Sequence, residues 1–328
     1  MRISIAMATY NGEAYLTQQL DSLRLQTRMP DQVIIVDDCS QDGTCKLIET
    51  YLERYQLQNW QLIRNSENVG YRKNFSNALS YTDGDIIFLC DQDDVWHADK
   101  VEEIEEVFRQ REEIRLLSTS FHVIDQQGLE IAQQEQKGKS NNNLLLVEVP
   151  ENEFLKITTD LLVKNGNFAQ GCCMAFRSEL KDLYLNISEN KGPHDFELNI
   201  LAAGMGGNYF YNRKMIGYRI HSNNTIGLME HPVSFSQKCS KAFRLQFDKK
   251  ENLELMKYLT QKNHLLQKEK QQANIRELEG YLAVYKKRND YIKAGCWFQL
   301  WLLNFDKKYQ TLFPFSSRLA DLISCIRG

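Results

Sequence analysis

The chain has 328 residues, of which 42% are hydrophobic and 25% are charged, and its formal net charge is −3. This composition is that of an ordinary folded protein with a sizeable core, and it excludes a disordered chain. No uninterrupted apolar stretch reaches the roughly 18 residues of a membrane span, and the apolar run at the N-terminus is too short for a secretory signal. We therefore expect a cytoplasmic protein with no nucleic-acid partner.

Strands and helices are expected to alternate in the first hundred residues, which is typical of parallel strands joined by right-handed crossovers. Apolar runs predict strands at residues 3–8, 33–36, 60–63 and 86–89, and amphipathic patterns predict helices at 14–25 and 72–79. Strands this apolar are buried on both faces of a sheet. A central parallel sheet is therefore predicted.

Further elements are expected downstream. A charged helix follows Asp94 to about residue 110, strands are predicted at 116–124, 168–176 and 214–220, and a helix at 196–203. The polar segment 126–150 contains a stretch at residues 139–143 that favours a mobile loop, serving either as a surface connection or as a lid.

The C-terminal part differs in both pattern and charge. Residues 238–328 carry 18 Lys and Arg against 9 Asp and Glu, a net charge of +9, whereas residues 1–237 carry −12. Such a split predicts two parts with different partners. Apolar side chains recur at helical spacing in two segments, which predicts a helical hairpin. These side chains are Phe243, Phe247, Leu255, Met256 and Leu259 in the first segment, and Ile275, Leu278, Leu282 and Tyr285 in the second.

The last segment, from Trp297 to Phe305 and beyond, combines aromatic residues with Lys and Arg. This pattern suits a helix lying in a membrane interface. A helix packed on the rest of the chain or on a second subunit fits it equally well, because an apolar stripe alone does not say what covers it.

Polar clusters follow three of the four expected strands, at residues 8–12, 37–44 and 91–94. Ligands bind at strand ends in open parallel sheets. Acidic residues after a strand are common helix caps, and we expect Asp42 to be one. Capping does not explain several carboxylates at one sheet edge, since unpaired anions repel one another unless a cation lies among them.

The third cluster is the most specific. Asp91 and Asp93 follow an apolar strand, and alternate strand residues point the same way, so both carboxylates are expected at one lip. Oxygen ligands suit Mg²⁺ or Mn²⁺, which would neutralise a departing diphosphate. Asp93 is the first candidate ligand.

Residues 7–11, 36–44, 68–74 and 89–96 together resemble the nucleotide-binding half of a family 2 glycosyltransferase with the GT-A fold. The resemblance covers about residues 1–225 and implies an α/β fold, with a Rossmann-like mixed sheet and flanking helices, followed by a helical C-terminal region. It implies a catalytic domain of residues 1–230, with a nucleotide-binding half at 1–96 and an acceptor half at 97–230, and a basic, amphipathic helical region at 231–328.

The resemblance also implies roles for single residues, and an inverting transfer. Asp91 and Asp93 serve as the metal motif, with His221 able to reach the metal or the pyrophosphate. The residues expected to bind the nucleotide sugar are Thr9, Tyr10, Asn11, Asp37, Asp38, Arg72, Asn74, Asp91 and Gln92.

The second half contains Gly192-Pro-His-Asp-Phe-Glu-Leu198, whose His-Asp pair resembles the catalytic-base motif of the same family. Asp195 is the residue that matches this motif. The chemistry needs such a group, since a positioned carboxylate must take the proton from the sugar hydroxyl. An N-cap for the following helix is the structural alternative. Gln170, Gly171 and His194 are expected on the acceptor side.

The sequences around His221 and at residues 90–96 resemble those of the rhamnosyltransferase-like branch of the family. This resemblance makes dTDP-rhamnose a candidate donor beside UDP- and GDP-sugars. The presence of Phe196 and Glu197, where such enzymes have Trp, puts the acceptor preference in doubt. We expect a saccharide acceptor in cell-surface polysaccharide synthesis. A lipid-linked form, contact with the inner face of the membrane through the C-terminal helices, and a homo-oligomer are further expectations.

Two other functions compete with a transferase. A nucleotidyltransferase that makes a sugar nucleotide predicts a Gly-rich basic loop after the first strand, and residues 9–13 contain no basic residue. A non-catalytic subunit that binds nucleotide sugars and organises an assembly complex is the second alternative.

Overall fold

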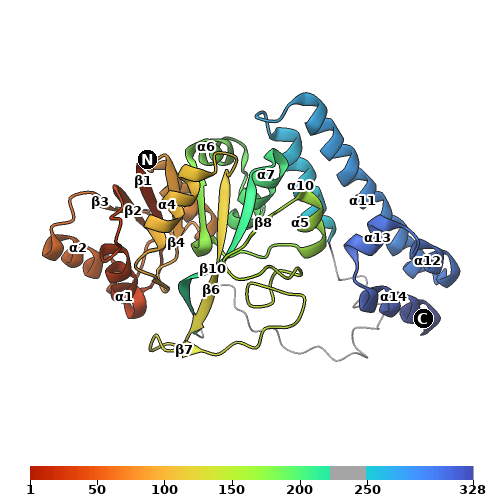
Figure 1. Ribbon diagram of the computed structural model, residues 1–328, viewed down its shortest axis with the longest axis horizontal. Coiled ribbons are helices and arrows are strands. Elements are labelled where there is room, and N and C mark those ends of the chain that lie inside the picture. Colours follow the sequence, from red (N-terminus) through yellow and green to blue (C-terminus); the bar gives the residue numbers. More distant parts are fainter. Residues whose placement is uncertain (222–248, 328) are drawn as a thin grey trace. The chain divides into compact units, whose positions relative to one another are not determined.

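The computed structural model describes residues 1–221 and 249–327 (Figure 1). The described residues form two compact units, one of residues 1–157 and 167–221 and the other of residues 158–166 and 249–327. The expected domain boundary at residues 230/231 lies outside the described residues, as do Phe243 and Phe247 of the first amphipathic segment.

The first half of the sheet is parallel, as the alternating pattern predicts. Its strands lie in the order β3-β2-β1-β4. All five residues of β4 are buried, in keeping with a strand covered on both faces. The elements are β1 (Ile3–Thr9), α1 (Glu13–Arg24), β2 (Gln32–Asp37), α2 (Thr44–Tyr55), β3 (Trp60–Arg64), α3 (Tyr71–Ser80) and β4 (Ile86–Cys90).

The second half makes the sheet mixed. β9 pairs antiparallel with both β4 and β6, and β10 lies parallel to β6, beside it in Figure 1. Helices α3, α6 and α7 contact one another and pack against the sheet. The elements are β5 (Val95–Trp96), α4 (Lys100–Gln110), β6 (Leu116–Ile124), β7 (Glu130–Ile131), β8 (Phe154–Lys156), η1 (Gly171–Cys173), β9 (Met174–Arg177), α6 (Ser178–Ile187), α7 (His194–Met205) and β10 (Asn208–Arg219).

Two local predictions are wrong. The strand expected at 168–176 forms only from Met174, because a 3₁₀ turn precedes it and Lys100 Nζ takes the Cys172 carbonyl as its acceptor. The cap of α2 is Gly43, while the Asp42 carboxylate accepts the Thr44 N–H from one position further out.

Side-chain hydrogen bonds hold the loop at 139–143 against the rest of the unit. Asn141 and Asn142 each donate a side-chain hydrogen bond of 2.8 Å, to the carbonyls of Phe168 and Phe121 respectively, and Asn141 is buried. Both residues adopt left-handed backbone conformations with φ of 53°, which asparagine tolerates better than most residues.

The second unit is helical, and the expected hairpin is confirmed by the packing of α10 (Lys250–Lys262) on α11 (Lys268–Ala294). It also contains α5 (Thr159–Asn165), α12 (Trp297–Leu303), α13 (Lys307–Leu312) and α14 (Phe315–Arg327). A fully buried ion pair between Arg288 and Asp321, 2.6 Å apart, ties α11 to α14, and the Tyr309 hydroxyl donates to the same carboxylate. None of the described helices combines the length and apolar character that a membrane span needs.

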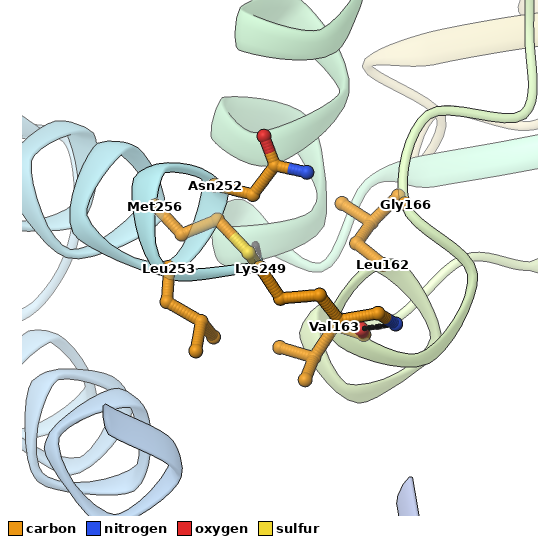
Figure 2. Close-up of a pocket in the computed structure, with 7 residues that line it drawn as sticks. All are labelled: Leu162, Val163, Gly166, Lys249, Asn252, Leu253 and Met256. Atoms are coloured by element: carbon orange, nitrogen blue, oxygen red, sulfur yellow. Dashed lines mark hydrogen bonds between the residues drawn. The ribbon is translucent and has the colours of Figure 1, made fainter. Parts of the chain in front are cut away.

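A small pocket lies between α5 and α10, lined by Leu162, Val163, Gly166, Lys249, Asn252, Leu253 and Met256 (Figure 2). Lys249 Nζ donates to the carbonyls of Val163 and Lys164 in the last turn of α5, and burial lowers its pKa to about 8. The cavity volume of about 10 Å³ is room for a single water. The pocket is therefore a small gap in the packing of α5 against α10, too small for a substrate.

Candidate active site

Residues from distant parts of the sequence meet at one edge of the sheet. β1, β2 and β4 are parallel, so Thr9, Asp37 and Asp91 lie at their carboxyl ends on the same side. β9 is antiparallel to β4, so residues 170–173 return to this edge just before it begins. β6 and β10 point the same way as β4, and His221 follows β10 there. The topology alone gathers the predicted site residues.

The Asp37 carboxylate joins the ends of β1 and β2. Its Oδ2 accepts hydrogen bonds from Thr9 Oγ1 at 2.9 Å and from Ser40 Oγ at 2.6 Å, and its Oδ1 accepts from the Ser40 N–H. Both Thr9 and Asp37 are buried. The two side chains predicted to line the nucleotide pocket are therefore engaged with each other.

Asp38 and Asn74 hold the loop between β3 and α3. The Asp38 carboxylate accepts the backbone N–H groups of Val69 and Gly70 and the side-chain amide of Asn65, each at 2.8 Å. Asn74 accepts from the same Asn65 amide and donates to backbone carbonyls at the ends of β2 and β1. Both residues are buried, so they shape this loop from below.

Gln92 joins the end of β4 to the end of β1. Its side-chain amide accepts from the Tyr10 N–H at 2.8 Å and donates to the Tyr10 carbonyl at 3.0 Å. A Cβ at Gly12 would collide with Gln92, which explains a glycine there. The Tyr10 ring is exposed. Asn11 adopts a left-handed conformation, and its Oδ1 accepts the Gln41 N–H.

Acidic groups crowd the end of β4. The potential ligand atoms of Asp91, Asp94 and Cys172 lie within 4.8 Å of one another. Asp93 Oδ2 lies 2.8 Å from His221 Nε2. The structure thus brings together the predicted pair Asp93 and His221, and it places beside Asp91 two residues, Asp94 and Cys172, that the sequence analysis did not assign to the site.

The crowding has an electrostatic consequence. Burial raises the pKa of Asp91 well above its ordinary value, and the carboxylates of Asp94, Asp93 and Asp195 raise it further. Burial and the neighbouring Asp93 raise the pKa of Asp94 to about 7. A divalent cation would relieve this repulsion. The contribution of Asp195 to the raised pKa of Asp91 indicates that its carboxylate lies near this cluster.

The chemistry of the predicted ligands suits a hard divalent cation. Carboxylate oxygens of Asp91 and Asp93 and an imidazole nitrogen of His221 would suit Mg²⁺ or Mn²⁺, whereas the group of described residues whose ligand atoms all lie within 4.8 Å of one another is Asp91, Asp94 and Cys172. A hydrogen bond with Cys173 and burial raise the pKa of the Cys172 thiol well above its ordinary value. Sulfur ligands select softer metals than Mg²⁺ or Mn²⁺, so Cys172 suits such an ion less well than the carboxylates do.

Arg219 holds Asp93 and Asp94 in place through hydrogen bonds. This buried side chain donates from Nε to the Asp93 carbonyl at 2.6 Å and from a terminal nitrogen to the Asp125 carbonyl at 2.9 Å. Its backbone N–H donates to Asp94 Oδ1 at 3.1 Å. Arg219 was not predicted as a site residue, although a basic residue ending a strand at an acidic edge is a signal for it.

Asp195 lies in the first turn of α7, and its Oδ1 accepts the Phe196 N–H at 2.7 Å. The N-cap of α7 is Pro193, so the capping alternative for Asp195 is wrong. Arg72, expected near the nucleotide, donates to the carbonyls of residues 190 and 191 in the loop that leads into α7. Its guanidinium therefore supports the acceptor-side loop.

His194 is buried and has no hydrogen-bond partner among the residues that the structure describes. Its side chain packs on Phe75 with ring centroids 4.1 Å apart, and neither ring nitrogen makes a hydrogen bond to any described residue. A Cβ at Gly171 would lie 2.6 Å from His194 Nε2. Burial lowers the pKa of His194, so its ring is neutral. Gln170 Oε1 is likewise buried and without a partner in the described part of the chain.

A buried lysine lies behind the acidic cluster. Lys100 Nζ donates to the Cys172 carbonyl at 2.8 Å and lies 3.6 Å from the centre of the Trp96 ring. Burial lowers its pKa to about 8. The sequence offered no signal for it beyond a charge at the start of a helix.

Stability of the first unit is expected to depend on Lys100 at alkaline pH. From pH 8 upward the folded protein releases the Lys100 proton, whereas the unfolded chain keeps it until about pH 10.5, so unfolding takes up a proton and stability rises with pH. The free energy of unfolding of the wild type, relative to Lys100→Met, should rise by about 2 kcal/mol between about pH 8 and about pH 9.5. Denaturant titrations measure it, and a constant difference would contradict the burial of a titrating amine.

Comparison with known proteins shows the family to which the chain belongs. The family model described as "Glycosyl transferase family 2" matches residues 4–183, more than half of the chain. The chain belongs to this family. The GT-A fold is shared with solved structures of Staphylococcus aureus TarS, among them its complex with UDP-GlcNAc, at a TM-score of 0.56 and 17% identity over 99% of this chain and 90% of that one. The predicted family and fold are confirmed.

Three further similarities are to named sugar transferases. The mannosyltransferase PcManGT from Pyrobaculum calidifontis, solved with GDP-Man and Mn²⁺, covers 99% of this chain and 86% of its own at a TM-score of 0.50 and 14% identity. The poly(ribitol-phosphate) β-N-acetylglucosaminyltransferase TarS of S. aureus is 36% identical over 96 residues, 29% of this chain. The dTDP-rhamnosyl transferase RfbG of Shigella flexneri is 35% identical over 102 residues, also 29% of this chain. This chain spans 16% of the length of TarS and 34% of that of RfbG.

Proposed function

We propose that the protein is a metal-dependent, inverting glycosyltransferase that moves a sugar from a nucleotide diphosphate to a hydroxyl of a saccharide acceptor. The observation that carries this proposal is the crowding of carboxylates at the end of β4, where the charge of Asp195 contributes to the raised pKa of Asp91 and the neighbouring His194 faces Gly171. Membership in the glycosyltransferase family supports the same chemistry.

Asp91 and Asp93, with His221, would hold Mg²⁺ or Mn²⁺. When bound, the ion supplies positive charge against the diphosphate as it leaves. Arg219 fixes the Asp93 backbone and Asp94, so the ligands are held by a rigid support.

Asp195 is the proposed general base. One of its oxygens is occupied by the Phe196 N–H, which orients the carboxylate at the start of α7. The other oxygen would take the proton from the acceptor hydroxyl as that oxygen attacks the anomeric carbon from the face opposite the diphosphate. Attack from that face inverts the anomeric centre.

The acceptor side would include Gln170, Gly171 and His194. A buried imidazole without a partner costs about 1–3 kcal/mol unless a ligand satisfies it. A sugar hydroxyl can both donate and accept, so it suits a neutral His194 and the unpaired Gln170 oxygen. The absence of a side chain at Gly171 leaves room for this approach.

The nucleotide would lie over the ends of β1 and β2. Tyr10 offers an exposed ring, while Thr9, Asp37, Asp38 and Asn74 would set the shape of the pocket through the bonds described above. Asn11, Arg72 and Gln92 would support the surrounding loops. The similarity to RfbG favours dTDP-rhamnose as the donor, and UDP- and GDP-sugars are the alternatives.

The donor is testable by thermal shift with a panel of dTDP-, UDP- and GDP-sugars, each with and without Mn²⁺. One nucleotide should raise the unfolding temperature only when Mn²⁺ is present, because a ligand at a hundredfold over its dissociation constant adds about 2.7 kcal/mol of stability. Asp91→Asn serves as the control that should lose the Mn²⁺-dependent part. An unchanged unfolding temperature with every nucleotide sugar would contradict the proposal.

A further inference from the structure

The second unit exposes a group of large apolar side chains on α12, on the turn after it and on α14. We call this group the aromatic face; it consists of Trp297, Phe298, Trp301, Leu302, Phe305, Phe315 and Leu319. Phe305 and Phe315 are each 71% exposed. Soluble proteins rarely leave such a cluster uncovered without a partner for it.

The rings of α12 pack on one another along the helix. Phe298 stacks on Trp301 with centroids 5.9 Å apart, and Trp301 meets Phe305 edge-on at 5.3 Å. The inward side chains Leu300 and Leu303 are buried, so α12 is fixed by its other side. The buried side of α12 thus fixes the position of the aromatic face within the second unit.

Positive charge borders the aromatic face. Between residues 291 and 325 the sequence contains four basic residues, Lys293, Lys307, Lys308 and Arg318, and two acidic residues, Asp306 and Asp321. Lys308 Nζ lies 3.9 Å from a Glu277 carboxylate oxygen, so Lys293, Lys307 and Arg318 are the cations that the rim offers. Both acids are occupied by the protein itself. Asp306 caps α13 through the N–H groups of Lys308 and Tyr309, and Asp321 is paired with the buried Arg288.

Arg318 links the two parts of the aromatic face. Its guanidinium donates to Asn304 Oδ1 at 2.8 Å and lies 5.7 Å from the centre of the Phe315 ring. This contact places a cation between the end of α12 and the start of α14. Lys293 and Lys307, on either side of α12 in the sequence, are exposed.

We propose that the aromatic face docks on the surface of a lipid bilayer that contains anionic lipids. Trp and Phe on one side of a short helix insert at the depth of the headgroups, where their rings leave water. Lys and Arg at the rim are attracted by anionic headgroups. The docking is peripheral, since α12 has only seven residues.

A second copy of the chain suits this face less well. A symmetric dimer would bring the same rim to both sides of the interface, so that Lys293, Lys307 and Arg318 would face like charges. A bilayer with negative headgroups complements the same rim.

The proposal is tested by flotation of the full-length chain with phosphatidylcholine vesicles, with and without phosphatidylserine. The wild type should float with the anionic vesicles, and the bound fraction should fall as salt rises. Trp301→Gln with Phe305→Gln, and separately Lys293→Glu with Lys307→Glu, should each reduce the partition coefficient by roughly tenfold or more.

Leu265→Gln is the matched control, because Leu265 is an exposed apolar residue of the same unit in the turn between α10 and α11. It should float like the wild type. Failure of the wild type to float, or equal flotation of all variants, would overturn the proposal. A wild-type dimer that Trp301→Gln with Phe305→Gln converts to a monomer, without any vesicle binding, would assign the face to self-association. None of these outcomes depends on the transfer reaction.

Discussion

Replacing Asp195 with asparagine is expected to lower the rate of sugar transfer by roughly 10²–10⁴-fold while nucleotide binding stays nearly unchanged. The amide keeps the shape of the side chain and can still accept the Phe196 N–H. It lacks the basicity to take a proton from a sugar hydroxyl. Steady-state transfer rates and donor titrations of the two proteins measure both parts of this expectation.

Asp182→Asn is the matched control for this experiment. Asp182 lies on α6, its side chain is 64% exposed, and it contacts only the neighbouring Lys181 among the ion pairs of the described residues. The same chemical change there should leave transfer within a factor of about two, as surface substitutions generally do. An Asp195→Asn protein with full turnover would show that another group accepts the proton.

Replacing Asp91 with asparagine is expected to remove the Mn²⁺ dependence of donor binding and to lower transfer by roughly 10²–10³-fold. The loss corresponds to several kcal/mol of charge stabilisation by a bound metal. Asp91 belongs to both overlapping groups at the end of β4, the predicted set with Asp93 and His221 and the cluster with Asp94 and Cys172.

Two further variants separate these groups. Asp93→Asn should weaken Mn²⁺ binding, whereas Cys172→Ala should leave it within roughly tenfold of wild type, because sulfur is a poor ligand for a hard cation. Mn²⁺ titrations followed by electron paramagnetic resonance give the affinities directly. The opposite order, with Cys172→Ala losing the metal and Asp93→Asn keeping it, would move the site to the Asp94 and Cys172 side.

The parallel half of the sheet could be predicted from the sequence because its signals are local. Each of its four strands is a run of apolar residues followed by polar ones, so β1 to β4 were placed within two residues of their true bounds. The polar ends of these strands then predicted the site edge, since parallel topology puts carboxyl ends on one side. The packing of α10 on α11 followed from apolar side chains at helical spacing.

Contacts between distant residues could not be predicted in this way. Arg219 bonds Asp93 and Asp94 across a separation of more than a hundred residues, and the pairing of β10 with β6 and with the short strand β5 brings it to that edge. Strands of two or three residues, such as β5, β7 and β8, have no periodicity to detect. The unpaired nitrogens of His194 are likewise visible only in three dimensions.

Some residues that are predicted to bind the nucleotide make hydrogen bonds to the protein itself. Asp38 and Asn74 are predicted to bind the nucleotide, and their polar atoms hold the loop before α3. Arg72 reaches the loop before α7. A sequence motif identifies residues that belong to a site. It does not separate residues that contact a ligand from residues that support the surrounding loops, because both kinds are polar and follow strands.

The most direct test of the central claim is the release of nucleoside diphosphate from a sugar nucleotide by the purified wild-type chain. We expect release that requires Mn²⁺ or Mg²⁺, that accelerates when a suitable saccharide acceptor is added, and that is nearly lost in Asp195→Asn. Nucleotide binding without cleavage of any sugar nucleotide would contradict the account and indicate a non-catalytic subunit, and pyrophosphate release from a nucleoside triphosphate and a sugar phosphate would indicate a nucleotidyltransferase instead.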